Sequence, residues 1–221
     1  MLTSIISFGV ILAFVLVIFC TIKWWNLTLT GTVPQPLYVF IAILFTSGLD
    51  VGLIMFPLAF DFPLYADTAA EPAYAFTNPL ALEFGFWGFL IWAFYFLTTF
   101  YFCAIEPRIK FFEIPAVKLL NNIVIITTCA FTGALFLIYM PYYIAEVGDG
   151  ETIQFVTPLT EYHEFYLFWW FAWSIMIGQF VSRFVGGLKT YQLLAALLIF
   201  PSIPLALWFS VLYFYFLNGI G

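Results

Sequence analysis

Six apolar runs are the feature that most constrains this chain, because each is long enough to cross a lipid bilayer. A membrane-spanning helix needs about 20 predominantly apolar residues. The predicted helices cover residues 3–26, 37–59, 81–104, 117–144, 161–183 and 191–217. The first run has no small-residue cleavage site after it, so we expect it to be retained. With 65% hydrophobic residues and 8% charged residues, the chain could not bury this apolar surface as a soluble domain. We therefore expect an all-α integral membrane protein, with residues 1–221 in a single membrane domain.

The charged residues separate to the two sides of this arrangement. One side holds all of the lysine and arginine residues, which are Lys23, Arg108, Lys110, Lys118, Arg183 and Lys189. The other side holds only acidic residues, which are Asp61, Asp67, Glu71, Glu83, Glu146, Asp149, Glu151, Glu161 and Glu164. Because basic loops tend to face the cytoplasm, we expect the inner (cytoplasmic) membrane, with basic loops cytoplasmic. Both termini and the acidic loops 60–80 and 144–160 would then lie outside. The net charge of −6 reflects this acidic outer surface, and we expect no nucleic-acid partner.

The residue types that usually carry catalysis or bind metals are scarce. Cys20, Cys103 and Cys129 are scattered in apolar runs, which favours packing over a disulfide or metal framework. The one histidine, His163, has no further ligands at metal-site spacing, so an interfacial hydrogen-bonding role is favoured. No phosphate-binding loop or catalytic triad is recognisable. We expect no cofactor, no metal and no enzymatic activity.

Aromatic residues lie inside two of the predicted helices, whereas membrane tryptophans usually lie at helix ends. Helix 161–183 carries Trp169, Trp170 and Trp173, and helix 81–104 carries Trp87, Trp92 and Tyr95. Rings three or four residues apart share a helix face. Two such faces could form a cage that binds a quaternary ammonium group by cation–π attraction. The alternative is that the rings only pack, and spacing alone favours packing in a chain that is 23% aromatic. This composition also predicts aromatic-filled helix contacts rather than close small-residue crossings.

The segment from Phe168 to Ser210 resembles the betaine/carnitine/choline transporter (BCCT) family. The matching residues are Trp169, Trp170, Trp173, Gly178, Phe180, Arg183, Gly187, Lys189, Thr190, Pro201, Trp208, Phe209 and Ser210. Two further motifs in the right order also match, with residues Trp87, Trp92 and Tyr95, and Gly48, Gly52, Leu53 and Met55.

The resemblance implies a trimethylammonium-type ligand such as betaine, choline or carnitine. Its cage would comprise Trp87, Trp92, Tyr95 and Trp170, with Trp169 and Trp173 along the inward path. Asp50 departs from the family pattern, in which the residue at this position is usually small. A carboxylate at this depth is costly and is normally paired, protonated or functional. Asp50 could therefore couple protons or offset the ligand charge, or it could simply hydrogen-bond helix 37–59 to a neighbour.

Family members have twelve helices in a LeuT-like fold, whereas this chain has about six apolar spans. The resemblance therefore implies a partial LeuT-like fold that retains the bundle helices and lacks most of the scaffold. We expect contacts with membrane lipids, and a homo-oligomer or other membrane subunits to supply the missing scaffold. The alternative is a non-transporting accessory or structural subunit of a larger membrane complex.

Overall fold

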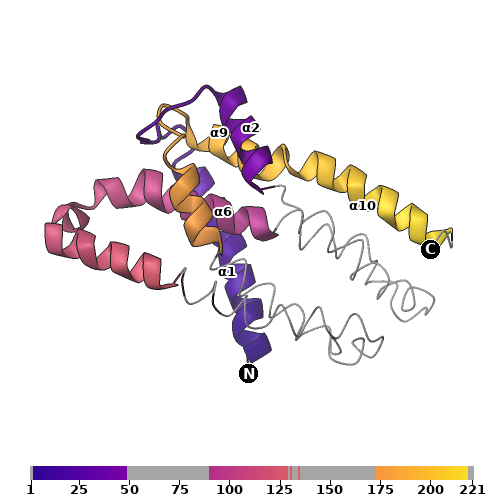
Figure 1. The fold of residues 1–221 in the computed structure, drawn as a ribbon, viewed down its shortest axis with the longest axis horizontal. Coiled ribbons are helices and arrows are strands. Elements are labelled where there is room, and N and C mark those ends of the chain that lie inside the picture. The colour runs from indigo at the N-terminus through magenta and orange to yellow at the C-terminus, as the bar shows by residue number, and fades with distance from the viewer. Residues whose placement is uncertain (1, 49–89, 129, 131–133, 135–172, 219–221) are drawn as a thin grey trace.

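The computed structural model describes residues 2–48, 90–128, 130, 134 and 173–218. This part of the chain is helical apart from its connecting loops, and its β-type pairing is an isolated antiparallel bridge between Thr28 and Lys189. The all-α prediction is therefore confirmed for the described residues. Figure 1 shows how the helices are arranged.

Helical residues are found within each of the six predicted spans. The α-helices are α1 (Leu2–Lys23), α2 (Leu37–Gly48), α6 (Ile91–Phe100), α9 (Thr190–Leu194) and α10 (Ser202–Leu217), with further helical stretches at Pro115–Thr128 and 173–181. The shorter turns are the π-helices η4 (Tyr101–Ile105) and η8 (Ala195–Ile199) and the 3-10 helices η5 (Glu106–Arg108) and η6 (Lys110–Glu113). Within the described ranges, one stretch, Thr190–Tyr215, is both long and apolar enough to cross a membrane. The number of six spans therefore stays a prediction.

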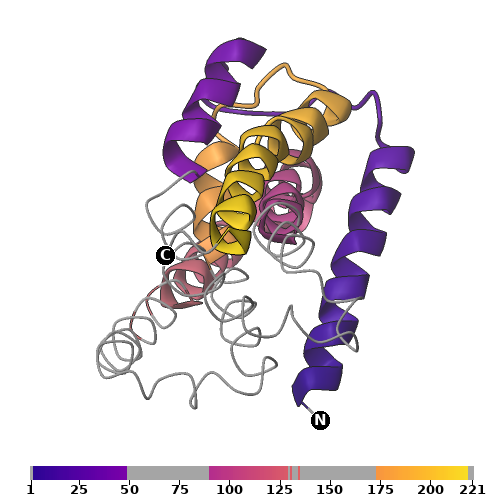
Figure 2. The same cartoon turned by 90° about the vertical axis from the view of Figure 1, so that its right-hand side faces the viewer.

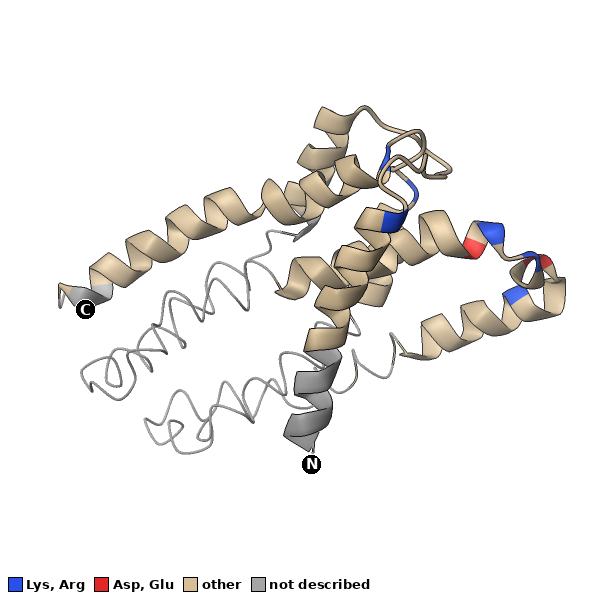
Figure 3. Ribbon diagram, turned by 180° about the vertical axis from the view of Figure 1, so that it is seen from behind, with Lys and Arg blue, Asp and Glu red and all other residues tan. Residues whose placement is uncertain are grey.

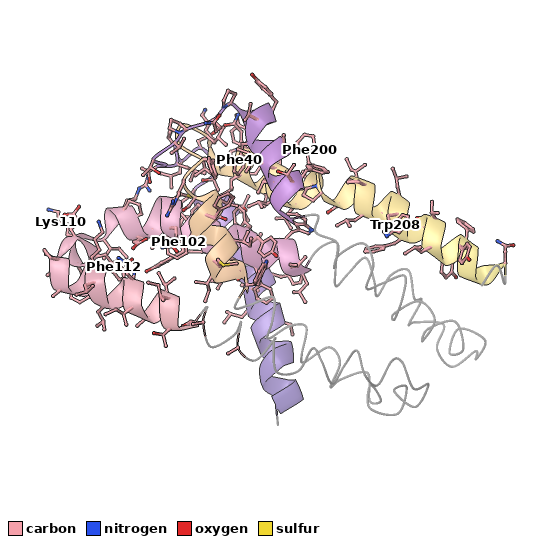
Figure 4. The ribbon with its side chains drawn as sticks, in the orientation of Figure 1. Phe40, Phe102, Lys110, Phe112, Phe200 and Trp208 are labelled. Carbon is pink, nitrogen blue, oxygen red and sulfur yellow. The ribbon has the colours of Figure 1, made fainter. Side chains whose placement is uncertain are left out.

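Helix α6 lies at the centre of the described fold. It packs against α1, α9 and η8. Trp92, Phe96 and Phe100 follow one another at four-residue spacing, so their side chains fall along one helix face, and all three are fully buried. Figures 1 and 2 show α1 and α2 on different sides of the segment formed by α9 and α10. Phe40 of α2, labelled in Figure 4, is also fully buried in this core.

The last apolar run is interrupted near its middle by Pro201. A proline cannot donate a backbone hydrogen bond, and its ring displaces the carbonyl of the residue four positions earlier. The preceding turn, η8, is widened to a π-helix, in which Phe200 N–H donates to the carbonyl of Ala195 at 3.1 Å. The Ser202 hydroxyl donates to the carbonyl of Leu198, which satisfies a backbone acceptor beside this turn. The predicted helix 191–217 is therefore present as one helical stretch, whose α-helical pattern is interrupted between α9 and α10.

Two loops far apart in the sequence are joined by backbone hydrogen bonds, and we call residues 24–36 together with 182–191 the basic clasp. The donor–acceptor pairs are Leu29 N to Leu188 O (2.8 Å), Gly187 N to Leu29 O (3.1 Å), Thr190 N to Leu27 O (3.1 Å), Val33 N to Arg183 O (2.8 Å) and Gln35 N to Phe184 O (3.1 Å). Helix η4 is tied to the same clasp, because the Thr30 hydroxyl donates to the carbonyl of Cys103 at 2.6 Å. The clasp therefore fixes the ends of several helices relative to one another.

Glycines make the close backbone contacts of the clasp possible. A Cβ atom on Gly31 would lie 2.5 Å from the backbone nitrogen of Gly186, closer than real contacts allow. Gly187 has a φ of 84°, a left-handed conformation that disfavours residues with a Cβ atom. Small residues therefore set the spacing of these two loops. The prediction of aromatic-filled contacts rather than close small-residue crossings is wrong for one pair of helices, where Gly178 lies against Thr98.

Candidate functional site

The two helices that carry the predicted cage residues contact each other through small side chains. The Thr98 hydroxyl of α6 donates to the backbone carbonyl of Ser174, in the helical stretch 173–181, at 2.7 Å. On the same stretch, a Cβ atom on Gly178 would lie 2.3 Å from the Thr98 hydroxyl oxygen and 2.5 Å from its Cβ atom. The absence of a side chain at Gly178 thus lets the two backbones approach closely.

Trp92 and Tyr95 form a ring pair on the buried part of α6. Their ring centroids are 5.5 Å apart and their planes are inclined at 84°, an edge-to-face arrangement. Trp92 is 1% exposed and Tyr95 is 3% exposed. Because the two residues are three positions apart on one helix, their contact follows from the helical geometry that the sequence predicts.

The indole N–H of Trp92 has no hydrogen-bond partner within the described part of the chain. Buried indole N–H groups usually find an acceptor, because an unpaired buried donor loses its hydration without compensation. Within the described residues, Trp92 thus combines a buried apolar ring with an unpaired N–H donor.

Trp173 stands at the start of the described stretch 173–181, next to Ser174, and is 38% exposed. The Thr98–Ser174 contact brings this end of the stretch to α6. The remaining predicted site residues, Trp87, Trp169, Trp170 and Asp50, lie outside the described residues, as does His163. The structure therefore brings two residues of the predicted cage, Trp92 and Tyr95, into contact, and it places Trp173, predicted along the path to the cage, on the neighbouring helical stretch.

Thr98 was not singled out by the sequence analysis, although its hydroxyl joins the two helices. The available signal was a threonine pair, Thr98–Thr99, in an otherwise apolar and aromatic run. Gly178 did appear in the family-like motif, and the structure supplies a physical reason for glycine there. Among the described residues, Cys20 and Cys103 are free cysteines, and Cys103 is buried.

Known proteins resemble this chain over part of its length. No family model matches it, and no solved structure matches it. A glycine betaine/proline/choline/ectoine transporter of Vibrio parahaemolyticus is 29% identical over 111 residues, which cover 43% of this chain and 19% of the transporter. Glycine betaine transporter 1 of the same species is 36% identical over 47 residues, which cover 21% of this chain and 9% of the transporter.

An uncharacterized transporter of Mycobacterium tuberculosis is 32% identical over 47 residues, covering 21% of this chain and 8% of that protein. The chain thus spans 19% or less of the length of these relatives. The relatives are named as transporters, so the similarity indicates a membrane protein. Over part of its length, the chain is similar to transporters named for glycine betaine, proline, choline and ectoine.

Proposed function

We propose that this chain binds a quaternary ammonium compound in an aromatic cage, as part of a membrane transporter whose scaffold comes from partner chains. Two relatives are named as transporters of such compounds, and this similarity supports the ligand class. The cage comprises Trp87, Trp92, Tyr95 and Trp170, with Trp169 and Trp173 along the path to it. In a cage of this kind, each ring contributes roughly 0.5–2 kcal/mol of cation–π attraction, depending on its desolvation.

The observation that carries this proposal is the buried Trp92–Tyr95 pair on the helix that contacts the Trp173 segment. The two rings pack edge to face with centroids 5.5 Å apart, and in the proposal they form one wall of the cage. A zwitterionic ligand such as glycine betaine carries a carboxylate as well as a trimethylammonium group. The unpaired indole N–H of Trp92 suits that acceptor.

Asp50 is the residue proposed to make binding depend on pH, either by taking up a proton or by offsetting the ligand charge. An intramembrane carboxylate is a functional-site hypothesis by default. Replacement by asparagine removes the titrating group and keeps the size of the side chain. If Asp50 has this role, ligand affinity varies with pH in the wild-type protein and is independent of pH in Asp50→Asn. The same pH dependence in both proteins would contradict it.

A second candidate function is that of a non-transporting subunit in a larger membrane complex. The helix over Pro115–Thr128 favours it, because Leu119, Leu120 and Ile126 are all strongly exposed. An apolar helix surface of this kind requires lipid or another chain as its neighbour. The same surface would serve a homo-oligomer that carries out transport, so ligand binding is the property that separates the two candidates.

Calorimetric titration of the full chain in detergent with glycine betaine, choline and carnitine tests the ligand proposal. We expect saturable binding of at least one compound, and several-fold weaker binding by Trp92→Phe, which loses the N–H donor. Trp25→Phe makes the same replacement at an exposed ring of the loop 24–36, and this variant should bind as the wild type does. Absence of binding by the wild type, or equal losses in the two variants, would favour the accessory-subunit alternative.

A further inference from the structure

The basic clasp and the adjacent end of α1 carry cations that have no described counter-ion. All six lysine and arginine residues are exposed, and Figure 3 shows them in two places away from both termini, around the clasp and along the connection that includes η5 and η6, where acidic residues also lie. Lys23, Arg108 and Lys189 form no ion pair within the described part of the chain. A group of like charges without counter-ions is a favourable place for an anion, particularly near a membrane, where salt screens less effectively.

Aromatic rings hold two of these ammonium groups in place. The Lys23 ammonium lies 4.6 Å from the ring centroid of Trp24, and the Lys189 ammonium lies 6.0 Å from that of Tyr191. Trp25, the residue after Trp24, stacks on Tyr191 with centroids 5.4 Å apart. The two lysines therefore lie on separate ring pairs, one at the end of α1 and one at the start of α9, and the adjacent residues Trp24 and Trp25 connect the two along the chain.

Arg108 is anchored to the part of the clasp that carries Lys189. Its Nη2 donates to the carbonyl of Thr28 at 3.1 Å, and its Nη1 donates to the carbonyl of Ala104 at 2.5 Å. Thr28 in turn forms the antiparallel bridge with Lys189. The guanidinium is thus anchored by backbone acceptors, and its charge is not neutralised by them.

An apolar stripe runs along α1 toward Lys23. Ile11, Val15, Ile18 and Ile22 are spaced four, three and four residues apart, so they share one helix face. Each of them is more than half exposed, and Ile22 directly precedes Lys23. Figure 2 shows α1 running along one side of the other described helices. A soluble anion would not contact this apolar stripe, whereas the acyl chain of a lipid would pack against it.

We propose that an anionic phospholipid binds here, with its headgroup phosphate between Lys23 and Lys189 and an acyl chain along the exposed stripe of α1. Trp24, Trp25 and Tyr191 provide the interfacial aromatic rings that favour headgroup depth. Arg108 adds positive charge at the edge of the site. This inference rests on the membrane location of the chain and is independent of the ammonium ligand.

The test uses the full chain released from mixed phosphatidylglycerol/phosphatidylcholine nanodiscs, with the retained lipid counted by native mass spectrometry. We expect preferential retention of phosphatidylglycerol by the wild type. Replacing both Lys23→Gln and Lys189→Gln should lower that preference by about tenfold, because each basic residue near an anionic surface adds to lipid attraction. The matched control, Lys110→Gln with Lys118→Gln, removes two exposed lysines that carry no aromatic contact and should change the preference little.

A second pair of changes separates a lipid from a soluble phosphate. Ile18→Ser with Ile22→Ser keeps every charge and should still reduce retention of phosphatidylglycerol, because the acyl-chain surface is lost. Soluble glycerol phosphate should not displace the bound lipid at equal concentration. Equal losses in the two lysine pairs, no effect of the isoleucine changes, or displacement by glycerol phosphate would each overturn the proposal. Unchanged ammonium-ligand titrations in these variants would show that the two sites are distinct.

Discussion

The hydroxyl of Thr98 donates to the backbone carbonyl of Ser174 at 2.7 Å and also lies 2.9 Å from the carbonyl of Phe94 in its own helix. Its one proton is therefore shared between an acceptor in α6 and an acceptor in the stretch 173–181. This contact links the helix of the Trp92–Tyr95 pair to the helix of Trp173. The rings of the candidate site thus depend for their relative position on a polar contact between small residues.

Replacing Thr98 with valine removes the donor and keeps the shape of the side chain. We expect Thr98→Val to lower the free energy of unfolding by about 1 kcal/mol, the usual contribution of a hydrogen bond between helices. Thr46→Val is the matched control, because the Thr46 hydroxyl bonds only to the carbonyls of Ala42 and Ile43 in its own helix. Thermal unfolding of both variants in the same detergent measures the difference. Equal midpoints would contradict a role of Thr98 between the helices.

Gly178, in the helical stretch 173–181, is the residue that lies against Thr98 of α6. A methyl group there would overlap Thr98, including its backbone carbonyl carbon at 2.8 Å, so a change of rotamer alone cannot relieve the clash. We expect Gly178→Ala to destabilise the protein by about 1–3 kcal/mol, as overpacking does in dense interiors. Met176→Ala, a change at a partly exposed position of the same stretch, should cost less. A stabilised Gly178→Ala variant, as helix propensity alone would produce, would show that the helices are not in close contact.

Features that depend on local sequence could be predicted for this chain. The helical spans follow from runs of apolar residues, and α1 ends at Lys23, within three residues of the expected boundary at position 26. The predicted end of helix 81–104 also lies within one residue of the observed end, because η4 ends at Ile105 and Pro107 follows it. The contact of Trp92 with Tyr95 follows from three-residue spacing on a helix.

Features that depend on distant residues could not be predicted in the same way. The pairing of loop 24–36 with loop 182–191 uses backbone groups, which every residue carries, so no pattern of side chains marks it. The π-helical turn before Pro201 was not predicted, because a proline inside an apolar run is tolerated in membrane helices. The partnership of Thr98 with Gly178 requires knowledge of which helices are neighbours. Aromatic content alone therefore gave the wrong expectation for this crossing.

Glu106 provides a pH-dependent prediction outside the predicted spans. Burial raises the pKa of its carboxyl above the ordinary value of 4.5, although a hydrogen bond from Asn121 and the charge of Lys118 act in the opposite direction. Because the folded state favours the protonated form, wild-type stability should fall as the pH rises from about 4.5 through the raised pKa. Glu106→Gln should remove this decline, since its amide oxygen can still accept the Asn121 bond at 3.0 Å.

The measurement for Glu106 is the unfolding midpoint between pH 4 and pH 8, in the wild type and two variants. Glu113→Gln is the control, because it removes a carboxylate from an exposed position of the same connection. At neutral pH, Glu106→Gln should be at least as stable as the wild type. The opposite result is a wild type whose unfolding midpoint rises with pH, with no such rise in Glu106→Gln. It would mean that the folded state favours the ionised carboxylate, so that the pKa of Glu106 is lowered and not raised.

Trp92 provides a prediction that separates stability from ligand binding. Its buried N–H is unpaired in the described part of the chain, so Trp92→Phe removes an uncompensated donor along with some ring surface. We expect the ligand-free variant to unfold within about 1 kcal/mol of the wild type, far less than the 3–5 kcal/mol that truncation of a buried tryptophan to alanine costs. Glycine betaine should raise the unfolding midpoint of the wild type by more than that of the variant. A large loss of stability in the ligand-free variant would mean that the indole N–H is already paired, which would leave it unable to donate to a ligand.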